Sequence, residues 1–268
     1  MCCRCLQKSY ACPEPDDSAV LVTGVSSGMG REFALDLVKQ GFTVIGTVRK
    51  QDDFNRLKEE GRIHPVMLDV SNASHFPEAL REVKSILETQ DVQLCALVNN
   101  AGMTGMDKTR ELSFVGPEHY DRVMATNVTG VVRATEAFLP LLKEVEGARV
   151  VNISSYMGNI CPAYPGLTAY VASKHAVEGL TDCWRRDFRQ QGIAAVLVKP
   201  GDFKTNMNDI DGAPTDLTPV IKCVRDAVMS ARPLARYYTG KVVIGGFSVG
   251  FLSRLMSVLP DSLADKLM

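Results

Sequence analysis

The sequence lacks an excess of charge of either sign. Its 30 lysine and arginine residues almost balance 31 aspartate and glutamate residues, which leaves a formal net charge of −1 over 268 residues. Proteins that bind nucleic acids usually carry a strongly basic patch or a basic overall balance. The composition gives no electrostatic reason to expect a nucleic-acid partner, and we exclude that class.

The sequence also lacks long hydrophobic runs. No stretch of about 18 or more apolar residues is present, which argues against a transmembrane helix. The first residues lack the apolar core of about 7–15 residues that a secretory signal needs, so we expect no such signal. With 46% hydrophobic residues, the chain can nevertheless bury the core of one large α/β domain.

Histidine and cysteine do not occur with metal-ligand spacing. The four histidines, at positions 64, 75, 119 and 175, form no ligand pattern, and we predict no metal site. Four of the eight cysteines stand singly, as free thiols do in a reducing compartment: Cys95, Cys161, Cys183 and Cys223. We therefore expect a cytoplasmic protein.

The remaining cysteines lie in the first segment, MCCRCLQKSYAC. We interpret residues 1–17 as a flexible, cysteine-rich tail. The alternative is S-acylation of Cys2, Cys3 or Cys5, which could hold the chain at a membrane surface if two acyl chains were attached. Peripheral membrane contact is therefore a hypothesis that the sequence raises.

Apolar segments and helical patterns alternate from residue 18 onwards. Helical periodicity is present, for example, over residues 30–41 and 76–90. Short apolar segments between the helical patterns have the character of buried strands, at residues 19–24, 42–49, 63–70, 94–102, 148–155 and 194–201. Six β/α units predict the α/β class, with a single Rossmann-type, doubly wound parallel sheet and helices on both faces.

Residues 18–268 are predicted to form one domain, with two departures from this rhythm. Residues 206–232, which include NDIDGAPTDLTP, are predicted to be an irregular insertion or a substrate lid. The C-terminal segment is amphipathic, with apolar residues spaced for one helix face: Phe251, Leu252, Leu255, Met256 and Leu259. This face could pack on the core, gate the substrate or contact a membrane surface.

The segment LVTGVSSGMGREFA predicts a dinucleotide site. Gly24, Gly28 and Gly30 fall where a buried strand gives way to a helix, so the backbone can approach a pyrophosphate at the helix N-terminus. The spacing T-G-x-x-x-G-x-G departs from the common G-x-G-x-x-G fingerprint.

The end of the second predicted strand, GTVRK, bears on the choice of cofactor. An acid at this place accepts from a ribose 2′-hydroxyl, whereas a base favours a 2′-phosphate. Val48 stands where the acid is expected and Arg49 follows it, so we favour NADP(H), with NAD(H) as the alternative. Arg49 and Lys50 could also be the solvated start of a loop.

Tyr170 and Lys174 lie one helical turn apart in AYVASKHAVEGL. Four residues at about 100° each place both side chains on the same side of a helix, an arrangement that solvated faces also show. A phenol with a pKa of about 10 is a poor base near neutrality unless a nearby cation stabilises the phenolate. Lys174 can supply that charge.

Six motifs in this order resemble those of the short-chain dehydrogenase/reductase family in its single-domain form: TGVSSGMG (23–30), LDV (68–70), NNAG (99–102), NISS (152–155), YVASK (170–174) and PGDFKT (200–205). The resemblance implies NAD(P)-dependent interconversion of an alcohol and a carbonyl compound. The C-terminal segment resembles those of retinol and 17β-hydroxysteroid dehydrogenases, which implies an apolar steroid, retinoid or lipid-like substrate. A non-catalytic NADP(H)-binding sensor or scaffold is the alternative, and we expect a homodimer or homotetramer.

The resemblance also implies roles for individual residues. Tyr170 would be the general acid or base, Lys174 would hold the nicotinamide ribose, and Ser155 would bind the substrate oxygen. Asn127, in ATNVTG, would complete a proton relay through water. The implied cofactor contacts are Gly24, Ser26, Ser27, Gly28, Met29, Gly30, Arg49, Asp69, Val70, Asn99, Ala101, Gly102, Tyr170, Lys174, Pro200, Gly201, Phe203 and Thr205. The 14 residues between Ser155 and Tyr170 exceed the usual length in the family.

Overall fold

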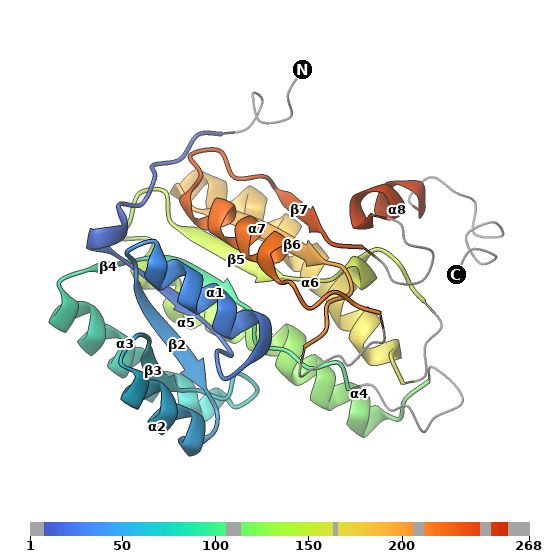
Figure 1. The fold of residues 1–268 in the computed structure, drawn as a ribbon, viewed down its shortest axis with the longest axis horizontal. Helices are drawn as coiled ribbons and strands as arrows, with labels where there is room; N and C mark the ends of the chain where they lie inside the picture. The colour runs from blue at the N-terminus through green and yellow to red at the C-terminus, as the bar shows by residue number, and fades with distance from the viewer. Residues whose placement is uncertain (1–7, 106–113, 163–165, 206–211, 242–247, 257–268) are drawn as a thin grey trace.

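The computed structural model describes residues 8–105, 114–162, 166–205, 212–241 and 248–256 (Figure 1). Its centre is one parallel sheet with the strand order β3-β2-β1-β4-β5-β6-β7. The strands are β1 (Ser18–Val22), β2 (Thr43–Val48), β3 (His64–Met67), β4 (Gln93–Asn99), β5 (Arg149–Ile153), β6 (Ala194–Pro200) and β7 (Arg236–Thr239). The predicted fold class is confirmed.

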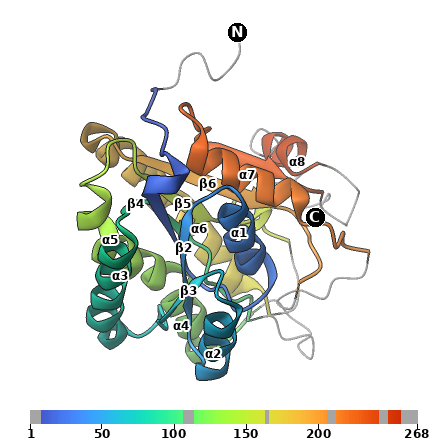
Figure 2. The ribbon, with the colours of Figure 1, turned by 60° about the vertical axis from the view of Figure 1, so that its left-hand side comes forward.

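Helices cover both faces of this sheet. They are α1 (Gly28–Lys39), α2 (Gln51–Glu60), α3 (Phe76–Gln90), α4 (Pro117–Met124), α5 (Gly130–Leu142), α6 (Thr168–Asp187), α7 (Thr218–Met229) and α8 (Val249–Met256). Short 3₁₀ turns are η2 (Pro15–Asp17), η3 (Ala73–His75), η5 (Tyr156–Gly158) and η6 (Phe188–Gln191), and η4 (Ala125–Thr129) is a π-helical turn. Figure 2 shows α1 and α7 on one side of the strands and α3 and α5 on the other.

The apolar composition of β1 follows from this two-sided cover. Val20 and Val22 pack in the core beneath α1 and α7, whereas Ala19 and Leu21 pack in the core beneath α3 and α5. All four side chains are fully buried. Burial of a valine or leucine side chain contributes about 1.5–3 kcal/mol, so a continuous apolar run stabilises a central strand on both faces.

The strand order places a topological switch between β1 and β4. The chain runs from β1 to β2 and β3 in one direction and then returns to β4 on the other side of β1. Helices that leave β1 and β4 therefore diverge to opposite faces and leave a crevice at the carboxyl ends of these strands. Open α/β sheets bind their ligands in such a crevice.

The prediction of a flexible tail over residues 1–17 is wrong for residues 8–17. The Tyr10 amide donates to the Ala231 carbonyl at 2.8 Å, and the Tyr10 ring lies 5.3 Å from the guanidinium carbon of Arg149. Arg149 is fully buried and donates through Nη2 to the carbonyls of Ala11 and Ser230, each at 3.0 Å. These contacts hold the segment on the domain. Residues 2, 3 and 5, the proposed acylation sites, lie outside the described residues.

The prediction of an irregular segment over residues 206–232 is wrong for its second half. Residues 218–229 form α7, whose Val220, Val224, Ala227 and Val228 are buried against the sheet. Residues 206–211 lie outside the described residues, so the lid hypothesis is limited to the remaining stretch before α7. Strand β7, which the sequence analysis missed, follows and pairs with β6.

The C-terminal segment forms α8 as far as Met256. Val249 and Ser253 are buried, whereas the Phe251 side chain is 54% exposed. The face that packs on the domain is thus the Val249–Ser253 face, and Phe251 of the predicted apolar face points away from it. Leu259 lies outside the described residues. None of the described helices combines the length and the apolar content that a membrane span requires.

Candidate active site

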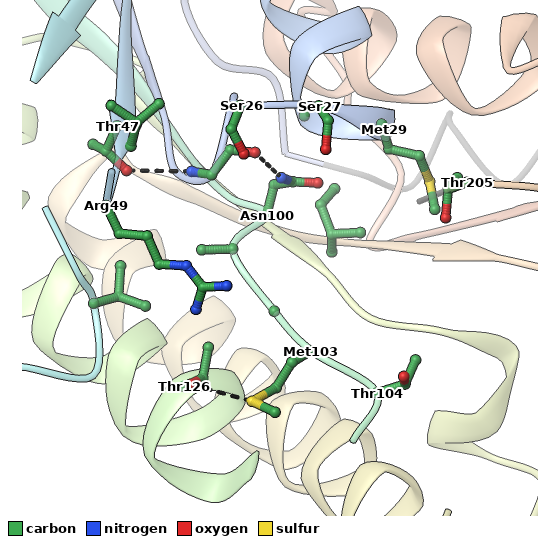
Figure 3. A pocket seen from close by; sticks show the side chains of 18 of the residues that line it. Ser26, Ser27, Met29, Thr47, Arg49, Asn100, Met103, Thr104, Thr126 and Thr205 are labelled. Carbon is green, nitrogen blue, oxygen red and sulfur yellow. Dashed lines mark hydrogen bonds between the residues drawn. The ribbon is translucent and has the colours of Figure 1, made fainter. Parts of the chain in front are cut away.

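A cavity of about 440 Å³ opens at the carboxyl ends of β1, β2 and β4, where the strand order predicts a ligand (Figure 3). Most of the implied cofactor contacts line it: Gly24, Ser26, Ser27, Gly28, Met29, Gly30, Arg49, Asp69, Val70, Ala101, Gly102, Tyr170, Lys174 and Thr205. The glycine-rich turn, the end of β2 and the Tyr–Lys pair of α6 therefore share one cavity.

The glycine-rich turn is held against β4 and β2 by hydrogen bonds. Asn100 donates through Nδ2 to the carbonyls of Thr23 at 2.9 Å and Gly24 at 3.0 Å, and the Gly24 amide donates to Thr47 Oγ1 at 3.2 Å. A Cβ atom at Gly30 would lie 2.3 Å from Asn100 Nδ2 and from the Gly24 carbonyl, so this position requires glycine. Helix α1 begins here without an acidic residue in its first turn. The turn thus fits a phosphate group at a helix N-terminus.

Arg49 and Asp69 lie at the other end of the cavity. Figure 3 shows the Arg49 guanidinium reaching from the end of β2 into the space between the glycine-rich turn and Met103. Partial burial would raise the pKa of Asp69, but hydrogen bonds from the Ser71 hydroxyl and amide and the charge of Arg49 hold it below its usual value. A cation and an ionised carboxylate therefore share this end of the cavity.

Several implied residues do not line the cavity. Asn99 is buried behind it, where Nδ2 donates to Thr135 Oγ1 at 3.1 Å and Asn152 Oδ1 at 2.8 Å. Its side-chain amide therefore joins neighbouring elements, Asn99 does not line the cavity, and its contact with the cofactor stays a prediction. Pro200, Gly201 and Phe203 also stand outside the lining. Asn100, from the same NNAG motif, does line the cavity and was not among the predicted contacts.

Ser155, Tyr170 and Lys174 meet where the ends of β5 and α6 come together. A hydrogen bond joins the Ser155 and Tyr170 side chains. Lys174 donates through Nζ to the Ile153 carbonyl at 2.9 Å and lies 5.5 Å from the centroid of the Tyr170 ring. Tyr170 is 8% exposed and Lys174 is 7% exposed, so both polar groups are held inside the protein at the wall of the cavity.

Burial dominates the titration of this pair. It raises the pKa of Tyr170 to about 12, although the Ser155 hydrogen bond lowers it and the charge of Asp202 adds to the rise. Burial lowers the pKa of Lys174 to about 8, although the charge of Glu178 opposes this change. Near neutrality the phenol is protonated, and the ammonium is still mostly charged.

Asn127 lies in the π-helical turn η4 between α4 and α5. Its Oδ1 accepts from the Met103 amide at 2.8 Å, while Nδ2 donates to the Met103 carbonyl at 2.8 Å and to Ser173 Oγ at 3.0 Å. The side chain is therefore engaged in fastening the segment after β4 to α6. Any part of Asn127 in a water relay would have to come from its main chain.

Comparison with known proteins identifies the family. The family model described as short chain dehydrogenase matches residues 18–214, which span the sheet from β1 to β6 and the whole cavity. The chain belongs to the short-chain dehydrogenase family, and the resemblance inferred from its motifs is confirmed.

Individual relatives agree with this assignment. The chain is 36% identical over 192 residues to mitochondrial D-beta-hydroxybutyrate dehydrogenase from Rattus norvegicus, covering 69% of this chain and 54% of the relative. It is 32% identical over 270 aligned positions to estradiol 17-beta-dehydrogenase 2 from Mus musculus, covering 85% of this chain and 69% of the relative. The chain thus spans about half the length of the first relative. The expected similarity to 17β-hydroxysteroid dehydrogenases is confirmed.

A solved complex with NADP also matches the chain. The RhlG/NADP active-site complex from Pseudomonas aeruginosa has a TM-score of 0.63 and 27% sequence identity. The match covers 73% of this chain and 78% of that chain.

Proposed function

We propose that this protein is an NADP(H)-dependent oxidoreductase that interconverts an alcohol and a carbonyl compound on an apolar substrate. The observation that carries the proposal is the convergence of Tyr170 and Lys174 at the wall of the cavity that the glycine-rich turn enters. Ser154 also lines this wall, whereas Ser155 does not line the cavity and reaches the site through its hydrogen bond with Tyr170. When bound, the nicotinamide cofactor supplies or accepts a hydride. The chain's own task is then to hold the substrate oxygen and to move one proton.

Tyr170 is the proposed proton donor in carbonyl reduction. Its pKa of about 12 keeps the phenol protonated near neutrality, as a general acid requires. The hydrogen bond to Ser155 orients the phenol and places a second hydroxyl where the substrate oxygen would bind. Lys174 holds a positive charge beside the ring and would stabilise the phenolate that remains after proton transfer. In alcohol oxidation the same groups would act in reverse.

The cofactor assignment rests on the two ends of the cavity. The Gly24–Gly30 turn and the N-terminus of α1 would receive the pyrophosphate, and Arg49 would receive a 2′-phosphate. Lys174 and Thr205 line the end where the nicotinamide and its ribose would lie. The NADP of the similar Pseudomonas complex supports this choice.

An apolar substrate is favoured by the side chains around Tyr170. The phenol belongs to a buried apolar cluster that also contains Tyr156, Met157, Ile160, Leu167 and Val249. Part of this cluster comes from the long segment between Ser155 and Tyr170, and Val249 comes from α8. The name of the mouse relative, which refers to estradiol, points to the same substrate class.

Turnover of a carbonyl panel tests the proposal. Aliphatic ketones, ketosteroids and retinal are offered with NADPH, hydroxysteroids and retinol with NADP, and the nicotinamide absorbance is followed. Tyr170→Phe is expected to lower kcat by at least about 100-fold while the Kd for NADPH stays within about twofold, because only the transferable proton is removed. Tyr120→Phe, on the exposed part of α4, is the matched control and should retain parental turnover.

Two results would contradict the proposal. More than about a tenth of parental activity in Tyr170→Phe would refute the role of the phenol. NADPH binding without turnover of any compound would favour the sensor or scaffold alternative.

A further inference from the structure

Glu178 is a buried carboxylate that the proposed reaction does not use. It lies on α6, one helical turn after Lys174, and is 7% exposed. A buried carboxylate is costly unless it is paired and hydrogen-bonded. Its partners therefore show what its charge stabilises.

Glu178 binds groups from two strands and from the residue that follows a third strand. Its Oε1 accepts from Ser154 Oγ at 2.8 Å and lies 2.8 Å from Nζ of the fully buried Lys199 on β6. Its Oε2 lies 3.5 Å from Arg236 Nε on β7, and Arg236 is also paired with Asp182 at 2.6 Å. The carboxylate thus joins α6 to the residue after β5, to β6 and to β7.

The contact between Glu178 and Ser154 is closely covered by η5. A Cβ atom at Gly158 would lie 2.8 Å from both Glu178 Oε1 and Ser154 Oγ. Only glycine lets the backbone of this turn pass so near the hydrogen bond. The fold therefore accommodates the pair at a position where a larger residue would displace it.

Three consecutive residues at the end of β5 contact three residues of one face of α6. The Ile153 carbonyl accepts from Lys174, Ser154 donates to Glu178, and Ser155 is hydrogen-bonded to Tyr170. Tyr170, Lys174 and Glu178 are spaced by four residues, so they follow one side of the helix. Glu178 is the third member of a row whose other two members face the reaction centre.

We propose that Glu178 is a positioning residue that fixes the Ser154–Ser155 backbone and supplies the negative charge against which Lys174 stays protonated. This inference rests on the proposed function of Tyr170 and Lys174. Among the described residues, the other charged or titratable groups of this cluster are Lys199 on β6, Tyr238 and Arg236 on β7, and Asp182 on α6, and Asp202 acts on the neighbouring Tyr170. Burial lowers the pKa of Lys174 and the charge of Glu178 raises it, so loss of this charge would lower it further.

The test removes the charge while preserving the shape of the side chain. Glu178→Gln alone would leave Lys199 buried without its counterion, so Glu178→Gln/Lys199→Met, which removes both charges, is the variant to measure. The fall of kcat/KM at high pH should move to a lower pH by at least about half a pH unit, because a neighbouring opposite charge shifts a pKa by about this much or more. Asp187→Asn, which removes an exposed carboxylate at the end of α6, should keep the parental profile.

A second measurement does not depend on turnover. In protein labelled with ¹³C at lysine Cε, the Lys174 signal is assigned by its absence in Lys174→Met and titrated by NMR. Its pKa should fall in the double variant and stay unchanged in Asp187→Asn. If the double variant does not fold, Glu178→Asp serves instead: it keeps the charge but withdraws it from Ser154. Glu178→Asp should lower kcat by about threefold or more and leave the pH at which kcat/KM falls unchanged.

The outcomes separate the two proposals. Suppose that the parent is active and that the folded double variant keeps both the parental pH profile and the parental pKa of Lys174. This result would overturn the role of Glu178 and leave the proposed function intact. An unchanged kcat in Glu178→Asp would likewise overturn the role of Glu178. If the pKa of Lys174 falls in the double variant but the parent turns over no carbonyl compound, the role of Glu178 is supported and only the proposed function is refuted.

Discussion

Replacement of Arg49 by alanine should separate the two nicotinamide cofactors. Arg49 is exposed and lines the cavity together with Asp69. A hydrogen bond to a charged group contributes about 1.5–3 kcal/mol, so Arg49→Ala should weaken NADPH binding by about 10- to 140-fold. Asp69 should push the loss towards the upper end, because without Arg49 its ionised carboxylate would repel a 2′-phosphate. NADH, which has a hydroxyl at this position, should change by less than about twofold.

The assay is a titration of parent and variant with each cofactor at one ionic strength, followed by nicotinamide fluorescence. A fixed ionic strength matters because salt screens exposed charges. Lys50→Ala is the matched control, since it removes the adjacent exposed cation, which is absent from the cavity lining. Equal weakening for both cofactors would show that Arg49 only supports the loop, and an unchanged Kd for NADPH would refute the contact itself.

Three further predictions concern the titration of the site and the N-terminal segment. The kcat/KM for carbonyl reduction should fall as the pH rises through about 8, because Lys174 loses its proton there, and a level profile up to about pH 10 would contradict this. Tyr10→Ala should lower the free energy of unfolding in urea by about 1–2 kcal/mol, because the ring covers the buried guanidinium of Arg149, whereas Ser9→Ala should change it little. If two acyl chains anchor the protein, replacing Cys2, Cys3 and Cys5 together by serine should shift the protein from the membrane fraction to the cytosolic fraction, as measured by cell fractionation. An equal cytosolic share for parent and variant would remove the acylation hypothesis.

The parts predicted well from sequence are those with a local signal. Residues 76–90 form α3 with the predicted bounds, because its apolar residues recur at helical spacing and Pro77 stands in its first turn. The cofactor turn was predicted because parallel strands of the doubly wound fold bring their carboxyl ends to one edge. Residues within two positions of a strand end, such as Gly24 and Arg49, therefore lie in the cavity lining.

The parts predicted less well depend on short elements and long-range contacts. Strand β7 has only four residues, and the Gly and Pro residues before Thr218 obscured the helical period of α7. Asn99 was assigned to the cofactor from its motif, but the direction of its side chain depends on Thr135 and Asn152, far away in sequence. The assembly into a homodimer or homotetramer stays a prediction.

The contacts of Glu178 had no sequence signal either. The carboxylate, Ser154 and Lys199 are separated by more than 20 residues from one another, and only the pairing of β5 with β6 and the packing of α6 bring them together. Buried charge pairs of this kind are decided by tertiary packing. The YVASK motif identifies the reacting residues, whereas the residues that position them can be identified only from the structure.

The segment from Lys8 to Cys12, which packs on the domain, determines where a tag or a solid surface can be attached without covering the cavity. It contacts Gly147 and Arg149, at the amino end of β5, whereas the cofactor cavity opens at the carboxyl ends of the strands. Whatever is joined to the chain ahead of Lys8 is thus attached at the edge of the sheet opposite the cofactor cavity. An affinity tag, a resin or a sensor electrode coupled there would leave the cavity mouth open to diffusing cofactor.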